Sequence, residues 1–254
     1  MDKILTVNNL TKNFGGISAL MNIYFDLMEG ELLSIIGPNG AGKTTILNCI
    51  TGFYRPTEGN ILFEGEEITR LKPYQIVKKG IGRTFQNIAL FKRMTVLDNI
   101  KLGAEVHMKY GLLSSAFYYG KARRTEVELR GEVEDKIINL LEIESIRHKV
   151  VGTLPYGFQK RVELGRALAI KPKLLLLDEP TAGMNVEETQ DMARYILDVI
   201  EETGISIILI EHDMGIVMDI SDRIIVLDFG QVIASGSPHQ IKGDPKVVQA
   251  YIGE

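Results

Sequence analysis

Short continuous runs of apolar residues recur along the chain, each bounded by turn residues or polar side chains. The clearest runs cover residues 32–36, 174–177 and 205–210. Runs of this length are typical of strands that are buried on both faces of a parallel sheet. The segment 18–27 instead alternates between apolar and polar positions towards its end, as a strand with one exposed face does. This contrast predicts a mixed sheet.

Segments with helical periodicity lie between the predicted strands. One such segment covers residues 187–202, and strands are predicted after it at 205–210 and 222–228. Alternating strands and helices form βαβ units, in which helices cover both faces of the sheet. The pattern therefore predicts an α/β fold.

The region over residues 95–170 has a different pattern. It is rich in helical periodicity, contains the charged run 121–128 and has no run that resembles a buried strand. We expect a helical subdomain here, inserted into an α/β core that residues 1–94 and 171–254 form. The whole chain, residues 1–254, is expected to be one domain.

The composition is that of an ordinary globular chain. Its 254 residues are 45% hydrophobic and 24% charged, with a formal net charge of −4. Because both signs of charge are interspersed, the sequence offers no basic stripe for nucleic-acid binding. It also has no window of 18 consecutive apolar residues, and residues 1–4 lack the features of a signal peptide. We therefore expect a cytosolic chain that associates with a membrane only through protein partners.

The chain has a single cysteine, Cys49. A lone cysteine excludes an internal disulfide and a metal site built from several cysteines. Its position in the helix predicted after Lys43 favours plain packing as its role.

A phosphate-binding motif directly follows the predicted strand at 32–36. The pattern G-x-x-x-x-G-K-[ST] is formed by Gly37, Pro38, Asn39, Gly40, Ala41, Gly42, Lys43 and Thr44. In such a loop, backbone N–H groups surround phosphate oxygens, and the positive end of the following helix strengthens the site. Lys43 can supply a charge to the β- and γ-phosphates, and the Thr44 hydroxyl can ligate Mg²⁺. The motif predicts nucleoside triphosphate binding, and the helix is expected to continue through Thr45 to Thr51-Gly52.

Two carboxylates follow the apolar run at 174–177. Asp178 and Glu179 are expected at the C-terminal end of this strand, where Asp178 can hold Mg²⁺ and Glu179 can polarise the attacking water. Taken alone, two acids after a strand can also begin a solvated turn. The phosphate-binding loop earlier in the chain favours the catalytic interpretation.

These motifs and three others occur in the order and approximate spacing of ATP-binding-cassette (ABC) ATPases, which the chain resembles over its whole length. The three others are Thr84-Phe85-Gln86, Leu154-Pro155-Tyr156-Gly157 and Glu211-His212-Asp213. Within this superfamily the chain is similar to the ATPase subunits of branched-chain amino-acid importers. That similarity lies in Phe14-Gly15-Gly16, Leu154-Pro155-Tyr156-Gly157, Ala182-Gly183-Met184-Asn185, the ending Asp244-Pro245 to Ala250-Tyr251-Ile252-Gly253, and the insertion between about residues 104 and 131. The resemblance implies a P-loop cassette fold with a mixed sheet core, an antiparallel β subdomain and a helical subdomain.

The resemblance also implies roles for individual residues. Phe14 matches the aromatic that stacks on adenine, although a phenylalanine in the core is the alternative. Gln86 matches the glutamine that reaches Mg²⁺ or the attacking water. His212 matches the histidine that contacts the γ-phosphate and orients Glu179. The family thus implies that Glu179, His212 and Gln86 are catalytic, and that Gln86 joins Thr44 and Asp178 at the metal.

The signature segment departs from the usual Leu-Ser-Gly-Gly-Gln. In the family this loop caps the ATP held by the opposite subunit, a role that would fall to Tyr156, Gly157 and the helix predicted over residues 159–169. Pro155 has neither a hydroxyl nor an N–H, and Phe158 stands where a polar residue is usual. We therefore expect a homodimer of this chain to have weak activity.

Two further features of the sequence each allow two interpretations. Asn185 replaces the more common aspartate of the turn that pairs across the dimer, and it can equally serve as the N-cap of the next helix. Aromatic and apolar residues gather over residues 110–119, where either a groove for a permease helix or packing within the helical subdomain is expected. The residues in this group are Tyr110, Leu112, Leu113, Phe117, Tyr118 and Tyr119.

The implied function is that of an ATP-hydrolysing importer subunit, with ATP and Mg²⁺ as cofactors, on the cytoplasmic face of the cell membrane. The implied partners are two transmembrane permease subunits, a second ABC ATPase that is a copy or a paralogue, and indirectly a solute-binding protein. Branched-chain amino acids are the expected solute, with urea or short amides as the alternative. A soluble cassette ATPase of DNA repair or translation would need a longer chain or two cassettes. An ATP-sensing module should lack Glu179 or His212, and both are present.

Overall fold

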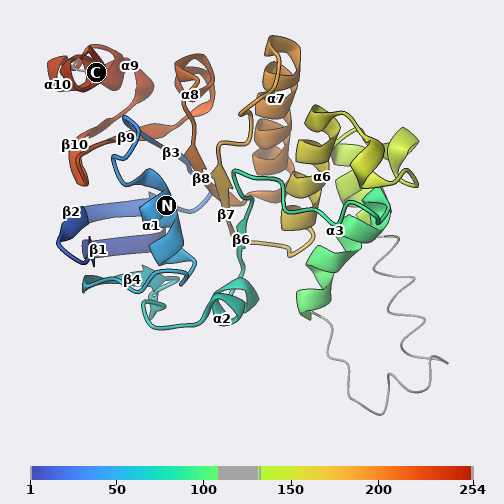
Figure 1. Cartoon of the computed structure of the whole chain (residues 1–254), viewed down its shortest axis with the longest axis horizontal. Helices are drawn as coiled ribbons and strands as arrows, with labels where there is room; N and C mark the ends of the chain where they lie inside the picture. The colour runs from blue at the N-terminus through green and yellow to red at the C-terminus, as the bar shows by residue number, and fades with distance from the viewer. Residues whose placement is uncertain (1, 108–130, 132, 253–254) are drawn as a thin grey trace.

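Two β-sheets form the frame of the molecule, and helices cover the larger one on both faces (Figure 1). The structure is a computed structural model that describes residues 2–107, 131 and 133–252. The larger sheet has the strand order β10-β9-β3-β8-β7-β6, and all its neighbouring strands are parallel except β9 and β10. Its strands are β3 (Leu32–Ile36), β6 (Ile81–Arg83), β7 (Leu174–Asp178), β8 (Ser206–Ile210), β9 (Arg223–Asp228) and β10 (Gln231–Gly236).

The smaller sheet is antiparallel and has the order β2-β1-β4-β5. Its strands are β1 (Lys3–Phe14), β2 (Ile17–Met28), β4 (Glu58–Phe63) and β5 (Glu66–Glu67). The alternation predicted over 18–27 is present in β2, where buried and more exposed residues follow one another. The predicted combination of a mixed sheet and an antiparallel β subdomain is therefore confirmed.

The α-helices follow the strands of the core or form the helical region. They are α1 (Lys43–Ile50), α2 (Pro73–Lys78), α3 (Val96–Ala104), α6 (Tyr156–Leu168), α7 (Val186–Thr203), α8 (Met214–Ile220), α9 (Pro238–Lys242) and α10 (Pro245–Ile252). Single turns are added by η1 (Glu105–His107), η3 (Glu144–Ile146) and η4 (Val151–Thr153), and η2 (Val133–Ile138) is a short π-helix. The described part of 95–170 contains helices and no named strand, as its sequence pattern predicts.

The larger sheet separates the two largest apolar cores. On β7, Leu174 and Leu176 face the core shared with α1 and the antiparallel sheet, whereas Leu175 and Leu177 face the core shared with α3, α6 and α7. All five residues of β7 are buried. Because side chains alternate across a strand, a strand covered on both faces is apolar along most of its length, here from Leu174 to Leu177, with Asp178 at its end as the exception. Burial on both faces explains the continuous apolar run in the sequence.

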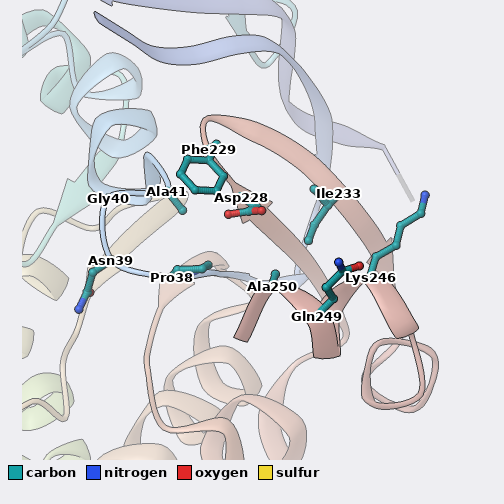
Figure 2. Close-up of a pocket in the computed structure, with 10 residues that line it drawn as sticks. All are labelled: Pro38, Asn39, Gly40, Ala41, Asp228, Phe229, Ile233, Lys246, Gln249 and Ala250. Carbon is teal, nitrogen blue, oxygen red and sulfur yellow. The ribbon is translucent and has the colours of Figure 1, made fainter. Parts of the chain in front are cut away.

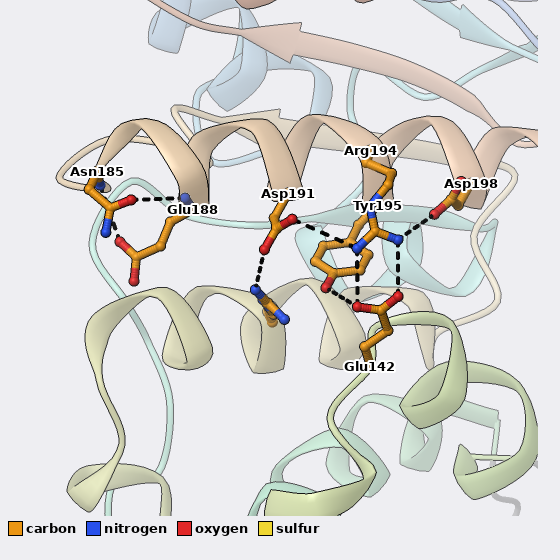
Figure 3. Close-up of polar contacts among 8 residues, drawn as sticks. Glu142, Asn185, Glu188, Asp191, Arg194, Tyr195 and Asp198 are labelled. Carbon is orange, nitrogen blue, oxygen red and sulfur yellow. Dashed lines mark hydrogen bonds and ion pairs between the residues drawn. The ribbon is translucent and has the colours of Figure 1, made fainter.

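The helical region is held against α7 by a cluster of polar contacts around Glu142 (Figure 3). The Arg194 guanidinium donates to both Glu142 carboxylate oxygens at 3.0 and 3.1 Å, and the Tyr195 hydroxyl donates to the same carboxylate at 2.9 Å. Arg161 on α6 reaches Asp191 on α7 at 2.9 Å. Since exposed ion pairs contribute at most about 1 kcal/mol each, the fully buried ring of Tyr195 contributes more to this junction than the charges do.

The start of α7 bears out one of the two interpretations of Asn185. Asn185 Oδ1 accepts a hydrogen bond from the Glu188 N–H at 3.0 Å, and Glu188 Oε2 accepts one from the Asn185 N–H at 3.1 Å. This reciprocal pair is a capping box, so the N-cap interpretation of Asn185 is confirmed (Figure 3). The aromatic cluster of 110–119 and the charged run 121–128 lie outside the described residues.

Candidate nucleotide site

The phosphate-binding loop joins β3 to α1, and its backbone depends on glycine. Gly37 has a φ of 147°, and a Cβ placed on it would lie 2.1 Å from the backbone oxygen of Leu227. Gly42 has a φ of 104°, and its Cβ would lie 2.8 Å from the backbone oxygen of Ala19. Strands β9 and β2 therefore pack so closely on the loop that side chains are excluded at both positions. Gly40 has a φ of 81° with open space around it.

Lys43 begins α1 and turns its side chain into the loop. Its ammonium donates to the backbone oxygens of Gly37 at 2.6 Å and Pro38 at 2.9 Å, and its residue is only 6% exposed. The N-terminus of α1 has no side-chain cap, so its first N–H groups are available to an anion. Thr44 is exposed and Thr45 half-buried at the same end of the helix. The predicted helix over this segment is confirmed.

Three of the predicted catalytic residues meet at the end of β7. The two carboxylate oxygens of Glu179 are both engaged: Oε1 lies 2.7 Å from His212 Nε2, and Oε2 accepts a hydrogen bond from Gln86 Nε2 at 2.8 Å. Gln86 lies just after β6, Glu179 just after β7 and His212 just after β8. The structure thus brings together side chains that are 93 and 33 residues apart in the sequence.

Glu211 holds together the two turns that carry Glu179 and His212, and its place beside His212 was its only signal in the sequence. It is buried, and its Oε1 accepts hydrogen bonds from the Thr181 N–H at 2.9 Å and the Thr181 hydroxyl at 2.7 Å. Its other oxygen accepts one from the His212 N–H at 3.1 Å. Glu211 therefore fixes the turn after β7 relative to the turn after β8.

Asp178 carries a buried carboxylate at the C-terminal end of β7. Its residue is 2% exposed, and Oδ2 accepts a hydrogen bond from Arg83 Nη2 at 2.8 Å. Burial raises the pKa of Asp178, and the Arg83 guanidinium opposes that rise. Among the described residues Oδ1 has no hydrogen-bond partner. An unpaired, buried carboxylate oxygen fits a divalent cation.

A magnesium ion at this site would be completed by groups beyond carboxylates. Among the described residues no group of three or more His, Cys, Asp or Glu side chains could hold a metal ion by itself. Mg²⁺ is commonly bound by one or two protein oxygens together with substrate phosphates and water. The Asp178 carboxylate and the exposed hydroxyl of Thr44 suit that arrangement better than a dedicated metal cage.

Three charged side chains on α6 form hydrogen bonds to the segment that carries Gln86. Lys160 donates to the backbone oxygens of Gln86 at 3.0 Å and Glu179 at 3.5 Å. Glu163, one helical turn later, accepts from the Ala89 N–H at 3.3 Å, and Arg166 donates to the Ala89 oxygen at 2.6 Å. Burial lowers the pKa of Lys160 and raises that of Glu163. Charged residues at i, i+3 and i+6 on a predicted helix were the available signal for this contact.

Phe14 lies at the end of β1 and is not a core residue. It is 42% exposed, and its ring packs edge to face on Tyr54 with centroids 5.0 Å apart. The ammonium of Lys12 lies 4.8 Å above the Phe14 ring. An exposed aromatic face beside a cation suits stacking on a base that carries phosphates.

The signature segment packs against the turn after β7 of its own chain. Helix α6 begins at Tyr156, three residues before the predicted start, because proline at the N-cap position does not interrupt the helix. A Cβ on Gly183 would lie 3.4 Å from the Tyr156 ring, and a Cβ on Gly157 would lie 2.5 Å from Glu188 Oε1. Tyr156 is 41% exposed and Gly157 is buried.

A pocket lies on the outer side of the phosphate-binding loop (Figure 2). It is bounded by the loop tip, by Asp228 and Phe229 in the turn between β9 and β10, and by α10. The ring of Phe229 and the carboxylate of Asp228 face the pocket, whereas the Lys246 ammonium points away from it (Figure 2). The described residues that line this pocket do not include Gln86, Glu179 or His212, which meet at the end of β7.

The fold and this site define the protein class. The ABC transporter family matches residues 20–182, and the family of branched-chain amino acid ATP-binding cassette transporters matches residues 231–254. The chain therefore belongs to the ABC transporter family, as the sequence motifs predict.

Curated relatives are similar over nearly the whole length. The high-affinity branched-chain amino acid transport ATP-binding protein BraF of Pseudomonas aeruginosa is 42% identical over 251 residues, covering 99% of this chain and 98% of the relative. The corresponding protein LivG of Escherichia coli is 41% identical over 254 residues with the same coverage.

Solved structures support the same assignment. An ATP-binding cassette of an ABC transporter in its ADP conformation has a TM-score of 0.86 and 37% identity, with 100% of both chains covered. A dimeric bacterial ABC transporter cassette has a TM-score of 0.77 and 27% identity over 92% of this chain and 98% of that one. None of the described helices of this chain is long and apolar enough to cross a membrane.

Proposed function

We propose that this chain is the ATP-hydrolysing subunit of an importer of branched-chain amino acids. The observation that carries hydrolysis is the placement of Glu179 between Gln86 and His212 at the end of β7. The names of the relatives, which are 41% and 42% identical over nearly the full chain, support the solute class. We also propose that residues 1–94 and 171–254 form the core and that residues 95–170 form the helical subdomain.

The phosphate-binding loop would hold the triphosphate. Within residues Gly37 to Thr45, the loop glycines and the N-terminus of α1 present backbone N–H groups, and Lys43 is already held inside the loop by two backbone oxygens. Phe14 would stack on the adenine. Mg²⁺ bound by Thr44, Asp178 and Gln86 would neutralise charge on the β- and γ-phosphates.

Glu179 would act on the attacking water. His212 Nε2 lies 2.7 Å from Oε1, and the Gln86 amide donates to Oε2. These two contacts fix the plane of the carboxylate, so that it can orient a water towards the γ-phosphate and accept its proton. His212 is also free to approach the γ-phosphate because 44% of its side chain is exposed.

Two cassettes would close face to face around two ATP–Mg²⁺. The dimeric cassette that this chain resembles supports such an arrangement. The N-terminus of α6, with Tyr156 and Gly157, would cap the nucleotide of the opposite cassette. Because Pro155 and Phe158 weaken that cap, a paralogous cassette is the proposed partner.

An apolar groove between the core and the helical region would receive a helix of the permease. Its walls include the exposed rings of Phe53 and Phe91, which are 57% and 58% exposed, and that of Phe85. Exposed aromatics that line a groove are typical of sites for partner helices. Two permease subunits docked in this way would hold the chain on the cytoplasmic face of the membrane, with a solute-binding protein delivering solute to them.

Purification from native membranes in mild detergent, followed by mass spectrometry, tests this assembly. We expect two polytopic proteins and a second cassette ATPase to copurify with this chain. The purified complex, reconstituted into vesicles with its solute-binding protein, should take up leucine in an ATP-dependent manner. Uptake of urea or short amides in place of leucine would overturn the solute class, and copurification with soluble machinery alone would overturn transport.

A further inference from the structure

The side chain of Arg83 connects three elements near the catalytic site, namely β6, α1 and β7. It ends β6, whose parallel pairing with β7 sets Arg83 beside Leu176. Its guanidinium donates to Asn48 Oδ1 at 2.7 Å and Thr51 Oγ1 at 3.2 Å, both at the C-terminal end of α1, and to Asp178 Oδ2 at 2.8 Å. One side chain therefore ties the helix of the phosphate-binding loop to the strand that carries Asp178.

The pair of Arg83 and Asp178 is almost completely removed from solvent. Their side chains are 7% and 2% exposed. A buried carboxylate is costly unless a fixed cation accompanies it, and the Arg83 guanidinium is that cation. Arg83 bonds to Oδ2, and among the described residues Oδ1 has no hydrogen-bond partner. Arg83 therefore fixes the carboxylate in an orientation that leaves Oδ1 available to a divalent cation.

The other face of the same guanidinium lies against the apolar groove. Arg83 lines that groove together with Phe53 and Phe85. The Arg83 guanidinium carbon is 5.1 Å from the centroid of the Phe85 ring, and the Phe85 and Phe53 rings meet edge to face at 6.2 Å. Phe85 also directly precedes Gln86. A ring on the groove wall is thus in contact with the group that pairs with Asp178.

We propose that Arg83 is a positioning residue that couples the occupation of the Phe53–Phe85 groove to the Mg²⁺-binding carboxylate of Asp178. This inference rests on the proposed function, because it takes the groove as the seat of a permease helix. A helix that enters the groove must displace or compress the two rings. Because the guanidinium contacts Phe85, a movement of this ring would move the guanidinium. The Asp178 carboxylate would then move as well, because it is joined to the guanidinium in a buried ion pair.

Two substitutions separate the parts of this coupling. Arg83→Met removes the charge and the hydrogen bonds but keeps a side chain of similar length. Arg83→Lys keeps a charge for Asp178 but lacks the planar fork that both bonds α1 and stacks on Phe85. Arg70→Met replaces an exposed arginine outside the groove and serves as the matched control.

The first readout is metal binding rather than turnover. Binding of a fluorescent ATP analogue to the purified cassette is measured without divalent cation and then against Mg²⁺ concentration. For Arg83→Met we expect nucleotide binding without Mg²⁺ to stay within about twofold of wild type, because Lys43 and the loop are intact. The Mg²⁺ concentration at half effect should rise by roughly tenfold. Arg83→Lys should restore most of that loss, and Arg70→Met should match wild type.

The second readout is stimulation of ATPase activity by the permeases in the reconstituted complex. We expect Arg83→Lys to lose most of the stimulation while its Mg²⁺ dependence stays near wild type. An unchanged Mg²⁺ dependence in a folded Arg83→Met variant would overturn the role towards Asp178. Full stimulation of Arg83→Lys would overturn the coupling to the groove. If wild type itself shows neither Mg²⁺-dependent hydrolysis nor stimulation, the proposed function fails instead.

Discussion

His212 and Glu179 face each other across two neighbouring strand ends, with Nε2 and Oε1 2.7 Å apart. The contact depends on the parallel pairing of β7 with β8, in which Asp178 lies opposite Ile210. Because the carboxyl ends of parallel strands share one edge of a sheet, residues just past each strand end come together there. The family resemblance implied this contact, and the shared edge of the two strands is the physical reason that it forms.

Glu179→Gln tests this relationship. The amide keeps the size of the side chain and can still bond to His212 and Gln86, but it cannot accept a proton from water. We expect ATP binding to be retained and turnover to fall by at least about 100-fold, the usual contribution of a general base. Steady-state hydrolysis and nucleotide binding by the purified variant measure both quantities. Unchanged hydrolysis would remove Glu179 from the proposed role.

Gly37→Ala tests the close packing of the phosphate-binding loop. The new Cβ would collide with the backbone oxygen of Leu227, which lies 2.1 Å away, at a φ of 147°. We expect a loss of about 3 kcal/mol in the free energy of unfolding. Gly16→Ala is the matched control because a Cβ there has nothing within 4 Å and its φ is ordinary. Denaturant unfolding of both variants measures the difference, and equal stabilities would contradict the packing.

The Cys49 thiol should be unreactive in the folded chain. It is buried on α1, and burial raises its pKa to about 11, with a small opposing effect of Lys12. We expect a thiol reagent at pH 8 to modify Cys49 only as the protein opens, and ATP–Mg²⁺ to slow the reaction further because it stabilises α1. Timed labelling with and without nucleotide measures this. Rapid labelling of one thiol per chain in the native protein would show that Cys49 is accessible and would contradict the prediction.

Much of the fold and of the site was predictable because the signals are local. A strand covered on both faces is apolar at nearly every position, as β3 is apart from Ser34 and β7 is up to Asp178, and the loop glycines and strand-end carboxylates lie next to those runs. Contacts between distant segments gave no such signal. Arg83 ends a three-residue strand, and its partner Asp178 is 95 residues away. The start of α6 was also placed too late, because the Pro155-Tyr156 pair suggests a loop until the helix is seen.

Lys160 should affect catalysis without touching the nucleotide of its own cassette. It is buried on α6 and donates to the backbone oxygens of both Gln86 and Glu179. Lys160→Met removes this donor, so the backbone oxygens of Gln86 and Glu179 lose the hydrogen bonds that tie both residues to α6. We expect kcat to fall by roughly tenfold while KM for ATP changes little, because the loop around Lys43 is untouched. Lys173→Met, which removes a largely exposed lysine paired with Glu64, should leave kcat unchanged.

The same variant should acquire a pH-dependent stability through Glu163. Burial already raises the pKa of Glu163, and Lys160 is the largest influence that lowers it. Without Lys160 the pKa in the folded state should rise further above the ordinary value of 4.5. Between the two values the folded chain binds more protons than the unfolded chain, so stability falls as pH rises through the folded-state pKa. We therefore expect the stability of Lys160→Met, relative to wild type, to fall as the pH is raised from the ordinary value of 4.5 to neutral pH. The double variant Lys160→Met, Glu163→Gln has no carboxyl to titrate and should lose this difference in denaturant unfolding. A pH-independent loss in the single variant would show that Glu163 finds another cation, and would contradict its pairing with Lys160.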